Sequence, residues 1–152
     1  MYVIFFSGSN VFKAVPKSAV AAIQVKDWKL FLAKLKNTNE GEQIEKAEAF
    51  NKLVNGYNSM LNLFSYGETL PVELNSDNVV ASLHVVSASG LDFLYTVRMK
   101  GVNDNDLINN IKGNKQVKTV SVRFYKGQKV VDLQMMDGRQ ITFAKLRDYL
   151  AF

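Results

Sequence analysis

Residues 79–98 read VVASLHVVSASGLDFLYTVR, and this stretch decides the fold class. Apolar and polar side chains alternate with a period of two on both sides of Ser87–Gly90, which predicts two strands joined by a hairpin loop. One face of the second strand is apolar throughout: Leu91, Phe93, Tyr95 and Val97. A hairpin pairs its two strands antiparallel, so we expect an antiparallel sheet.

The chain downstream continues as strands separated by short turns. The predicted strands are 117–125, 128–135, 141–146 and 149–152. Lys126-Gly127 and Asp137-Gly138 are residue pairs of the kind found in tight hairpins. Connections this short exclude parallel crossovers. A short helix, 103–111, precedes these strands; Asn103 or Asp104 begins it and Gly113 ends it.

In the chain before residue 65, apolar residues recur mostly with the three- and four-residue spacing of an α-helix. A buried strand is expected at 19–25, and Asp27 can cap a first helix. One face of that helix is apolar: Trp28, Phe31, Leu32 and Leu35. A second helix is predicted from Glu42 to Phe64, with a stripe that Gly56 weakens only locally. The stripe consists of Ala47, Phe50, Val54, Tyr57, Leu61 and Phe64. It either packs on the core or fills a partner's groove.

These elements predict an α+β fold: a twisted antiparallel sheet with two N-terminal helices and one short helix packed on one face. We expect residues 1–10 to form a membrane-proximal stub and linker. Residues 11–152 then form a single α+β domain, which we predict to be a truncated lobe of a larger domain.

Both ends of the chain are apolar, whereas most termini are solvated. Residues 2–6 are too few to cross a bilayer, which takes about 17–25 apolar residues. They are either the outer end of a membrane helix or an ordinary core strand. Tyr149–Phe152 is expected to continue the sheet pairing, so the chain stops in mid-strand.

Composition excludes several kinds of site. The chain has no cysteine, which removes thiolate nucleophiles and cysteine-ligated metals, and its single histidine excludes a multi-histidine metal site. The net charge of +5 is uneven. Residues 10–36 carry +5, residues 37–111 carry −6 and residues 112–152 carry +6. The basic segments are either solvated faces or a surface that meets phosphate.

No catalytic arrangement is recognisable. His84 lies on the strand face opposite Ala81, and the sequence names no carboxylate to orient it. The acidic run Glu40–Glu48 suits a helix N-terminus. Asp104-Asn105-Asp106 lacks the rest of a calcium loop, so helix capping explains it better. We therefore predict no catalytic, cofactor-binding or metal-binding residue. An enzyme using His84 or a carboxylate pair stays open as an alternative.

One strand combines basic and aromatic residues, as RNA-binding sheets do. Residues 120–127 read VSVRFYKG. Phe124 shares its face with Val120 and Val122, which indicates core packing rather than base stacking. Tyr125 shares the other face with Arg123, but one ring is a weak signal, so we expect no nucleic acid.

Several short stretches resemble one bacterial family, catalogued as domain of unknown function 3352. They are Val15-Pro16-Lys17-Ser18-Ala19, Ala81–His84 followed by Leu91–Leu94, Phe124–Gly127, and Leu150-Ala151-Phe152. The resemblance implies an extracytoplasmic domain of a membrane-anchored cell-envelope protein, of which this is the N-terminal part. It carries no functional residue over to this sequence.

The sequence thus predicts a non-enzymatic envelope domain with a structural or protein-interaction role and no cofactor. Its partner would be another envelope protein or the remainder of its own chain, with a membrane tether upstream. The alternative function is a basic module that binds anionic lipid or nucleic acid.

Overall fold

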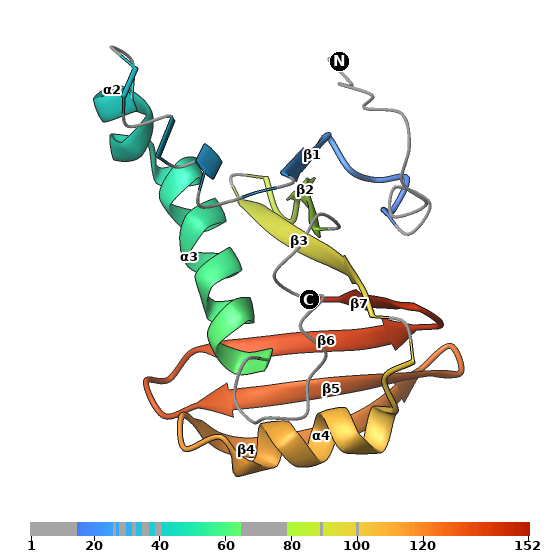
Figure 1. Ribbon diagram of the computed structural model, residues 1–152. Helices are drawn as coiled ribbons and strands as arrows, with labels where there is room; N and C mark the ends of the chain where they lie inside the picture. The colour runs from blue at the N-terminus through green and yellow to red at the C-terminus, as the bar shows by residue number, and fades with distance from the viewer. Residues whose placement is uncertain are drawn as a thin grey trace.

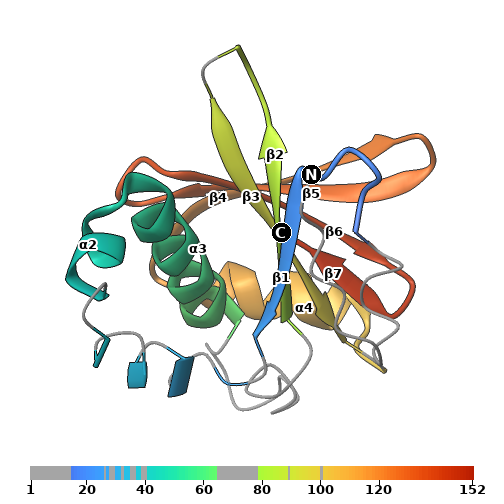
Figure 2. The ribbon, with the colours of Figure 1, turned by 90° about the horizontal axis from the view of Figure 1, so that it is seen from above.

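The fold is an antiparallel sheet with helices on one side, as Figures 1 and 2 show. The computed structural model describes residues 15–25, 27, 30–31, 33–34, 37–38, 41–64, 79–88, 90–99 and 101–152. Among these residues, seven strands form one sheet in the order β1-β2-β3-β7-β6-β5-β4, and every neighbouring pair is antiparallel. The strands are β1 (Ala21–Val25), β2 (Val79–Val85), β3 (Leu91–Arg98), β4 (Val117–Tyr125), β5 (Gln128–Met135), β6 (Gln140–Leu146) and β7 (Tyr149–Ala151).

The α+β class and the antiparallel sheet are therefore confirmed. So are the predicted turns, whose backbones need left-handed dihedral angles. Lys126 and Gly127 have φ of 48° and 78°, as a tight two-residue hairpin requires, and Gly138 has φ of 87°. The Val86 amide donates to the Gly90 carbonyl at 2.9 Å, which closes the hairpin between β2 and β3.

The N-terminal helices differ from the prediction. The expected single helix Glu42–Phe64 is two helices, α2 (Gly41–Lys46) and α3 (Glu48–Phe64), separated at Ala47. Helices in proteins are held mainly by their apolar face. Ile44 is the one large apolar residue of α2, and it is 37% exposed, so little holds α2 in line with α3. The expected helix around Trp28 falls mostly outside the described residues, although Asp27 does accept a bond from the Leu30 amide at 2.8 Å.

The buried face of α3 is rotated from the predicted stripe. Tyr57 and Phe64 are buried as predicted, but Ala47 is exposed and Val54 only half-buried. Their places in the core are taken by other apolar residues of the helix: Leu53, Met60 and Leu63. The rotation brings Gly56, which has no side chain, against the ring of Tyr95 on β3.

The short helix α4 (Asp104–Gly113) is confirmed, with Asn103 as its N-cap. The Asn103 side chain accepts from the Asn105 amide at 2.8 Å. Leu107, Ile108 and Ile111 of this helix are buried in the same core cluster as the inward side chains of β5. Both α3 and α4 therefore pack on one face of the sheet (Figure 1).

Two strand predictions fail at the edges of the sheet. Val122 and Phe124 were predicted to lie in the core, but they are 45% and 72% exposed. They lie on β4, an outer strand with no neighbour beyond it among the described residues. Strand β1 lies at the opposite edge, and Ile23 there is 37% exposed rather than buried.

The predictions about residues 1–10 fall outside the described residues. None of the described helices is long and apolar enough to span a bilayer.

The contact between Gly56 and Tyr95 gives a stability test. A Cβ atom on residue 56 would lie 2.7 Å and 2.8 Å from two carbons of the Tyr95 ring. Gly56→Ala should therefore destabilise the fold by about 1–3 kcal/mol through overpacking, despite a gain of about 1 kcal/mol in helix propensity. The free energy of unfolding can be measured by urea titration.

Gly113→Ala is the matched control, because Gly113 also lies in a helix but nothing is within 4 Å of its Cβ position. This variant should be neutral or stabilised by up to about 1 kcal/mol. Equal effects of the two substitutions would contradict the close packing of α3 on Tyr95.

Candidate functional site

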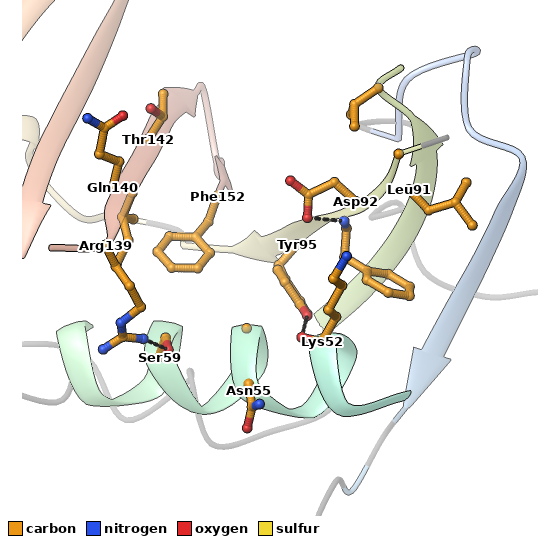
Figure 3. A pocket seen from close by; sticks show the side chains of 15 residues that line it. Lys52, Asn55, Ser59, Leu91, Asp92, Tyr95, Arg139, Gln140, Thr142 and Phe152 are labelled. Carbon is orange, nitrogen blue, oxygen red and sulfur yellow. Dashed lines mark hydrogen bonds between the residues drawn. The ribbon is translucent and has the colours of Figure 1, made fainter. Parts of the chain in front are cut away.

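A cleft of about 800 Å³ lies between α3 and the sheet (Figure 3). Its walls come from three elements that are distant in sequence. Helix α3 contributes Lys52, Asn55, Gly56 and Ser59; β3 and the loop before it contribute residues 90–93 and 95; and β6 contributes residues 140–142. Phe152 lies at one end of the cleft, between β3 and β6 (Figure 3).

The cleft lies where β3 and β6 extend past the described residues of β7. Strand β7 has three residues, whereas β3 has eight and β6 has seven. Strand β7 pairs with Thr96–Arg98 on one side and Ala144–Leu146 on the other. Phe152 adds one more pair, exchanging two bonds of 2.9 Å with Tyr95. Beyond Phe152, no described residue lies between β3 and β6 as a strand.

Backbone groups of both strands consequently face the gap without a strand partner. In an antiparallel strand, alternate residues direct their N–H and C=O groups to opposite neighbours. The main-chain groups of Tyr95 bond toward the β7 side of β3. The main-chain groups of Phe93 and Leu91, two and four residues earlier, therefore point to the same side, where the gap lies. By the same alternation, Thr142 and Gln140 of β6 face the gap, since Arg139 bonds to Met135 of β5.

One of these backbone groups is bonded by a side chain instead of a strand. The Phe93 amide donates to Asp92 Oδ1 at 2.9 Å. An unpaired backbone amide is costly when it loses water, so local side chains often bond to it. Asp92 thus takes the place that a neighbouring strand would occupy at Phe93.

The side of the cleft that faces α3 is aromatic. The Tyr95 ring lies 6.5 Å from that of Phe93 and 6.2 Å from that of Phe152, measured between centroids. Phe93, Ile141 and Phe152 are each only half-buried, although they contact the core. An apolar surface is therefore available to an occupant.

Tyr95 is fixed in this wall and is unsuited to proton transfer. Its hydroxyl donates to the Leu53 carbonyl at 2.6 Å. Burial, and secondarily the charge of Asp92, raise its pKa well above the ordinary value of 10.0. The phenol is therefore neutral at physiological pH, and it serves as a bond between β3 and α3.

The charged side chains of the cleft are partly neutralised by neighbours. Lys52 pairs with Glu48 at 3.1 Å. Arg139 pairs with Asp137 at 2.7 Å and also donates to Ser59 Oγ at 2.5 Å, which connects the turn before β6 to α3 (Figure 3). Asp92, in contrast, has an ion-pair partner in none of the described contacts. It is the acidic group that an occupant of the cleft would meet.

His84 does not line the cleft, and its described hydrogen bonds are with two serine hydroxyls. The Ser82 hydroxyl donates to the Leu94 carbonyl at 3.2 Å, so its oxygen accepts from His84 Nε2 at 2.9 Å. Under this hydrogen-bond assignment Nε2 donates to Ser82, while the other ring nitrogen, Nδ1, lies 3.5 Å from the Ser18 hydroxyl oxygen. No described hydrogen bond joins the ring to a carboxylate that would orient it. Asp92 is the residue opposite His84 in the sheet, but it bonds to the Phe93 amide.

The other acidic residues have structural roles. Asp104 lies 3.1 Å from Lys145 and 3.9 Å from Lys129, at the start of α4. The part of the chain that the structure describes contains no group of three His, Cys, Asp or Glu residues able to hold a metal ion. Of the acidic run, Glu48 pairs with Lys52 one helical turn later, and Glu40 lies outside the described residues.

Much of the charge of the C-terminal basic segment is used in internal ion pairs. Arg123 donates to Asp132 at 2.6 Å across β4 and β5. Hydrogen bonds from Arg123 and then from Thr142 lower the pKa of Asp132. The pairs of Arg123 with Asp132 and of Arg139 with Asp137 lie within this segment and are already counted in its net charge of +6, whereas Asp104 of the preceding segment adds one negative charge beside Lys129 and Lys145.

Comparison with known proteins adds no relative. No protein-family model, curated protein or solved structure matches this chain. The resemblance to the family of unknown function 3352 therefore stays a prediction.

The raised pKa of the Tyr95 hydroxyl predicts that the stability of the fold depends on pH. Because folding raises the pKa of Tyr95, its contribution to stability is complete below pH 10 and is lost as the pH rises further. The pKa of Tyr57 is raised in the same direction by burial. The free energy of unfolding should therefore fall above about pH 10.

Tyr95→Phe should reduce stability by about 1 kcal/mol at pH 8, because the bond to Leu53 is lost, and should make the alkaline fall less steep. Urea titrations at several pH values from 8 to 11 can be compared for this variant and the unchanged chain. Tyr125→Phe, at a 58% exposed position, controls for the loss of a hydroxyl. An unchanged alkaline slope in Tyr95→Phe would refute the assignment.

Proposed function

We propose that this protein is a non-enzymatic interaction domain of the bacterial cell envelope, and that its cleft takes up an extended polypeptide segment, from another envelope protein or from the remainder of its own chain. The observation that carries the proposal is the gap in the sheet between β3 and β6. There, main-chain groups of Phe93, Leu91, Thr142 and Gln140 face an open, partly apolar cleft. An extended polypeptide complements such an edge, because main-chain bonds bind it without a specific sequence.

Other uses of the cleft are less well supported. The Tyr95 phenol is engaged by a main-chain carbonyl, and Arg139 by Ser59 and Asp137. The remaining polar groups do not converge on one point where a reacting atom could lie. The anionic-lipid or nucleic-acid alternative rests on the net charge of +6 of residues 112–152, and of the basic residues there only Arg139 lines the cleft.

The envelope location rests on the sequence resemblance. A chain with an extracytoplasmic domain and a membrane tether would be recovered with the membranes after expression of the full-length gene product. Recovery only in the soluble cytoplasmic fraction would refute this part of the proposal. The interaction role of the cleft does not depend on it.

The interaction role can be tested by filling the cleft. Ser59 is half-buried and lines the cleft on α3, so Ser59→Trp should place an indole where the segment would lie. Peptides selected from a randomised library on the purified chain and then resynthesised should bind the unchanged protein. Their affinity for Ser59→Trp should fall at least tenfold, measured by calorimetry or fluorescence anisotropy.

Two variants separate the filling of the cleft from other effects. Ser59→Ala removes the bond to Arg139 without adding bulk, and should retain most of the affinity. Asn58→Trp adds the same indole at an exposed position of α3 that does not line the cleft, and should bind normally. Failure to select any peptide, or equal binding by Ser59→Trp and Asn58→Trp, would refute the proposal.

A further inference from the structure

Strand β4 exposes three large apolar side chains at the outer edge of the sheet, beside α4 (Figure 1). They are Val122, Tyr125 and Phe124, and Phe124 has the largest exposed fraction, 72%, of the large apolar side chains in the described part of the chain. Phe124 pairs with Lys129 and Val122 with Val131 of the core, so both lie on the α4 face of the sheet. Adjacent apolar side chains left in water on one strand indicate an interaction surface.

The segment that forms this edge is basic throughout. Residues 112–131 contain six cations and no acidic residue: Lys112, Lys115, Lys118, Arg123, Lys126 and Lys129. Among the described ion pairs, Arg123 is paired with Asp132 and Lys129 with Asp104. None of these pairs involves the other four lysines. Four lysines therefore accompany the exposed apolar side chains without an acidic partner among the described contacts.

The lysines lie at both ends of the exposed strand. Lys126 is in the turn that follows β4, and its Nζ lies 5.5 Å from the centroid of the Tyr125 ring. Lys118 lies at the start of β4, within its register irregularity. Lys112 is in the last turn of α4 and Lys115 follows that helix, and both are exposed. The edge thus combines aromatic rings with cations that are free to meet negative charge outside the chain.

We propose that the β4 edge docks on the surface of an anionic phospholipid bilayer, with the rings of Phe124 and Tyr125 in the headgroup layer and the four lysines on lipid phosphates. Aromatic side chains favour the boundary between membrane and water. Each lysine held near an anionic membrane raises the affinity about fivefold. This surface is distinct from the cleft, because β5 lies between β4 and β6 in the sheet. The inference therefore goes beyond the proposed function and does not rest on it.

A second copy of the chain fits this edge poorly. Pairing of two β4 strands would bring Lys118, Arg123 and Lys126 of both copies together, and like charges on neighbouring strands destabilise a sheet. The register irregularity between Val117 and Thr119 also interrupts the row of main-chain groups that another strand would need. The main chain of this edge is thus protected from other strands, whereas its apolar side chains stay exposed.

Single-stranded nucleic acid fits the charge of this edge but not the placement of its rings. Sheets that bind nucleic acid present several rings on one face, where successive bases stack on them. Phe124 and Tyr125 are consecutive, so they lie on opposite faces of the strand. The neighbour of Phe124 on its own face is Val122, on which no base can stack as on a ring. Lipid headgroups rearrange around both faces of the edge at once, and the arrangement therefore favours a bilayer.

The test uses the full chain and vesicles made of equal parts of phosphatidylglycerol and phosphatidylcholine. Co-sedimentation should show binding at about 50 mM NaCl that falls at least tenfold at about 500 mM, and vesicles of phosphatidylcholine alone should bind little. Phe124→Ala should weaken binding about five- to tenfold and leave the urea midpoint unchanged, because the side chain is exposed. Val85→Ala is the control, since Val85 is also exposed and apolar but lies on β2, and this variant should bind normally.

The lysines are tested with two double variants of equal net charge. Lys118→Gln combined with Lys126→Gln removes two cations of the β4 edge, and should weaken binding at least tenfold. Lys17→Gln combined with Lys34→Gln removes two exposed cations that lie before and after β1, and should weaken binding about twofold or less. The difference between the two variants isolates the position of the charge from its amount.

Phe124→Trp reports whether the edge enters the bilayer. Its emission, after subtraction of the Trp28 signal of the unchanged chain, should shift to the blue on anionic vesicles and be quenched by brominated acyl chains. No binding at low salt, equal binding of the two double lysine variants, or an unquenched indole would overturn the inference. So would tighter binding to an oligothymidylate than to vesicles, with loss of that binding in Phe124→Ala. None of these outcomes bears on peptide binding in the cleft, so the proposed function is tested separately.

Discussion

The close approach of α3 to Tyr95 at Gly56 is the contact on which the arrangement of the cleft depends. Any larger residue at position 56 would meet the tyrosine ring, so glycine sets how near the helix lies to β3. The Tyr95 hydroxyl then bonds to the Leu53 carbonyl and fixes the helix at that distance. Arg139 holds the same helix to β6 through Ser59. The helix therefore spans the gap in the sheet and is attached on both sides of it.

The local elements could be predicted from the sequence because their causes are local. Alternation of apolar residues predicted the strands, and Lys126-Gly127 supplied the dihedral angles that a tight turn requires. The face of α3 could not be predicted in the same way. Two overlapping stripes are available on that helix, and the choice was made by the fit of Gly56 on Tyr95, which joins residues 39 positions apart. From helix propensity alone, a glycine inside a helix is expected only to destabilise that helix, and its close contact with another element is not foreseen.

The cleft itself was beyond sequence reasoning. It depends on β7 lying between β3 and β6, and nothing in residues 149–152 specifies which strands they join. The period-two pattern also predicted burial of Phe124, since it reports which residues share a face but not whether a helix covers that face.

The outer edge of the sheet at β4 and the inner gap between β3 and β6 differ in the residues that line them. Along β4, the outer edge carries a register irregularity between Val117 and Thr119, and the cations Lys118 and Arg123. Irregular pairing and charge are the devices by which proteins keep exposed edges from joining other sheets. At the inner gap, the residues whose main-chain groups face it are uncharged, and the wall toward α3 is aromatic. These residues are Leu91, Phe93, Gln140 and Thr142.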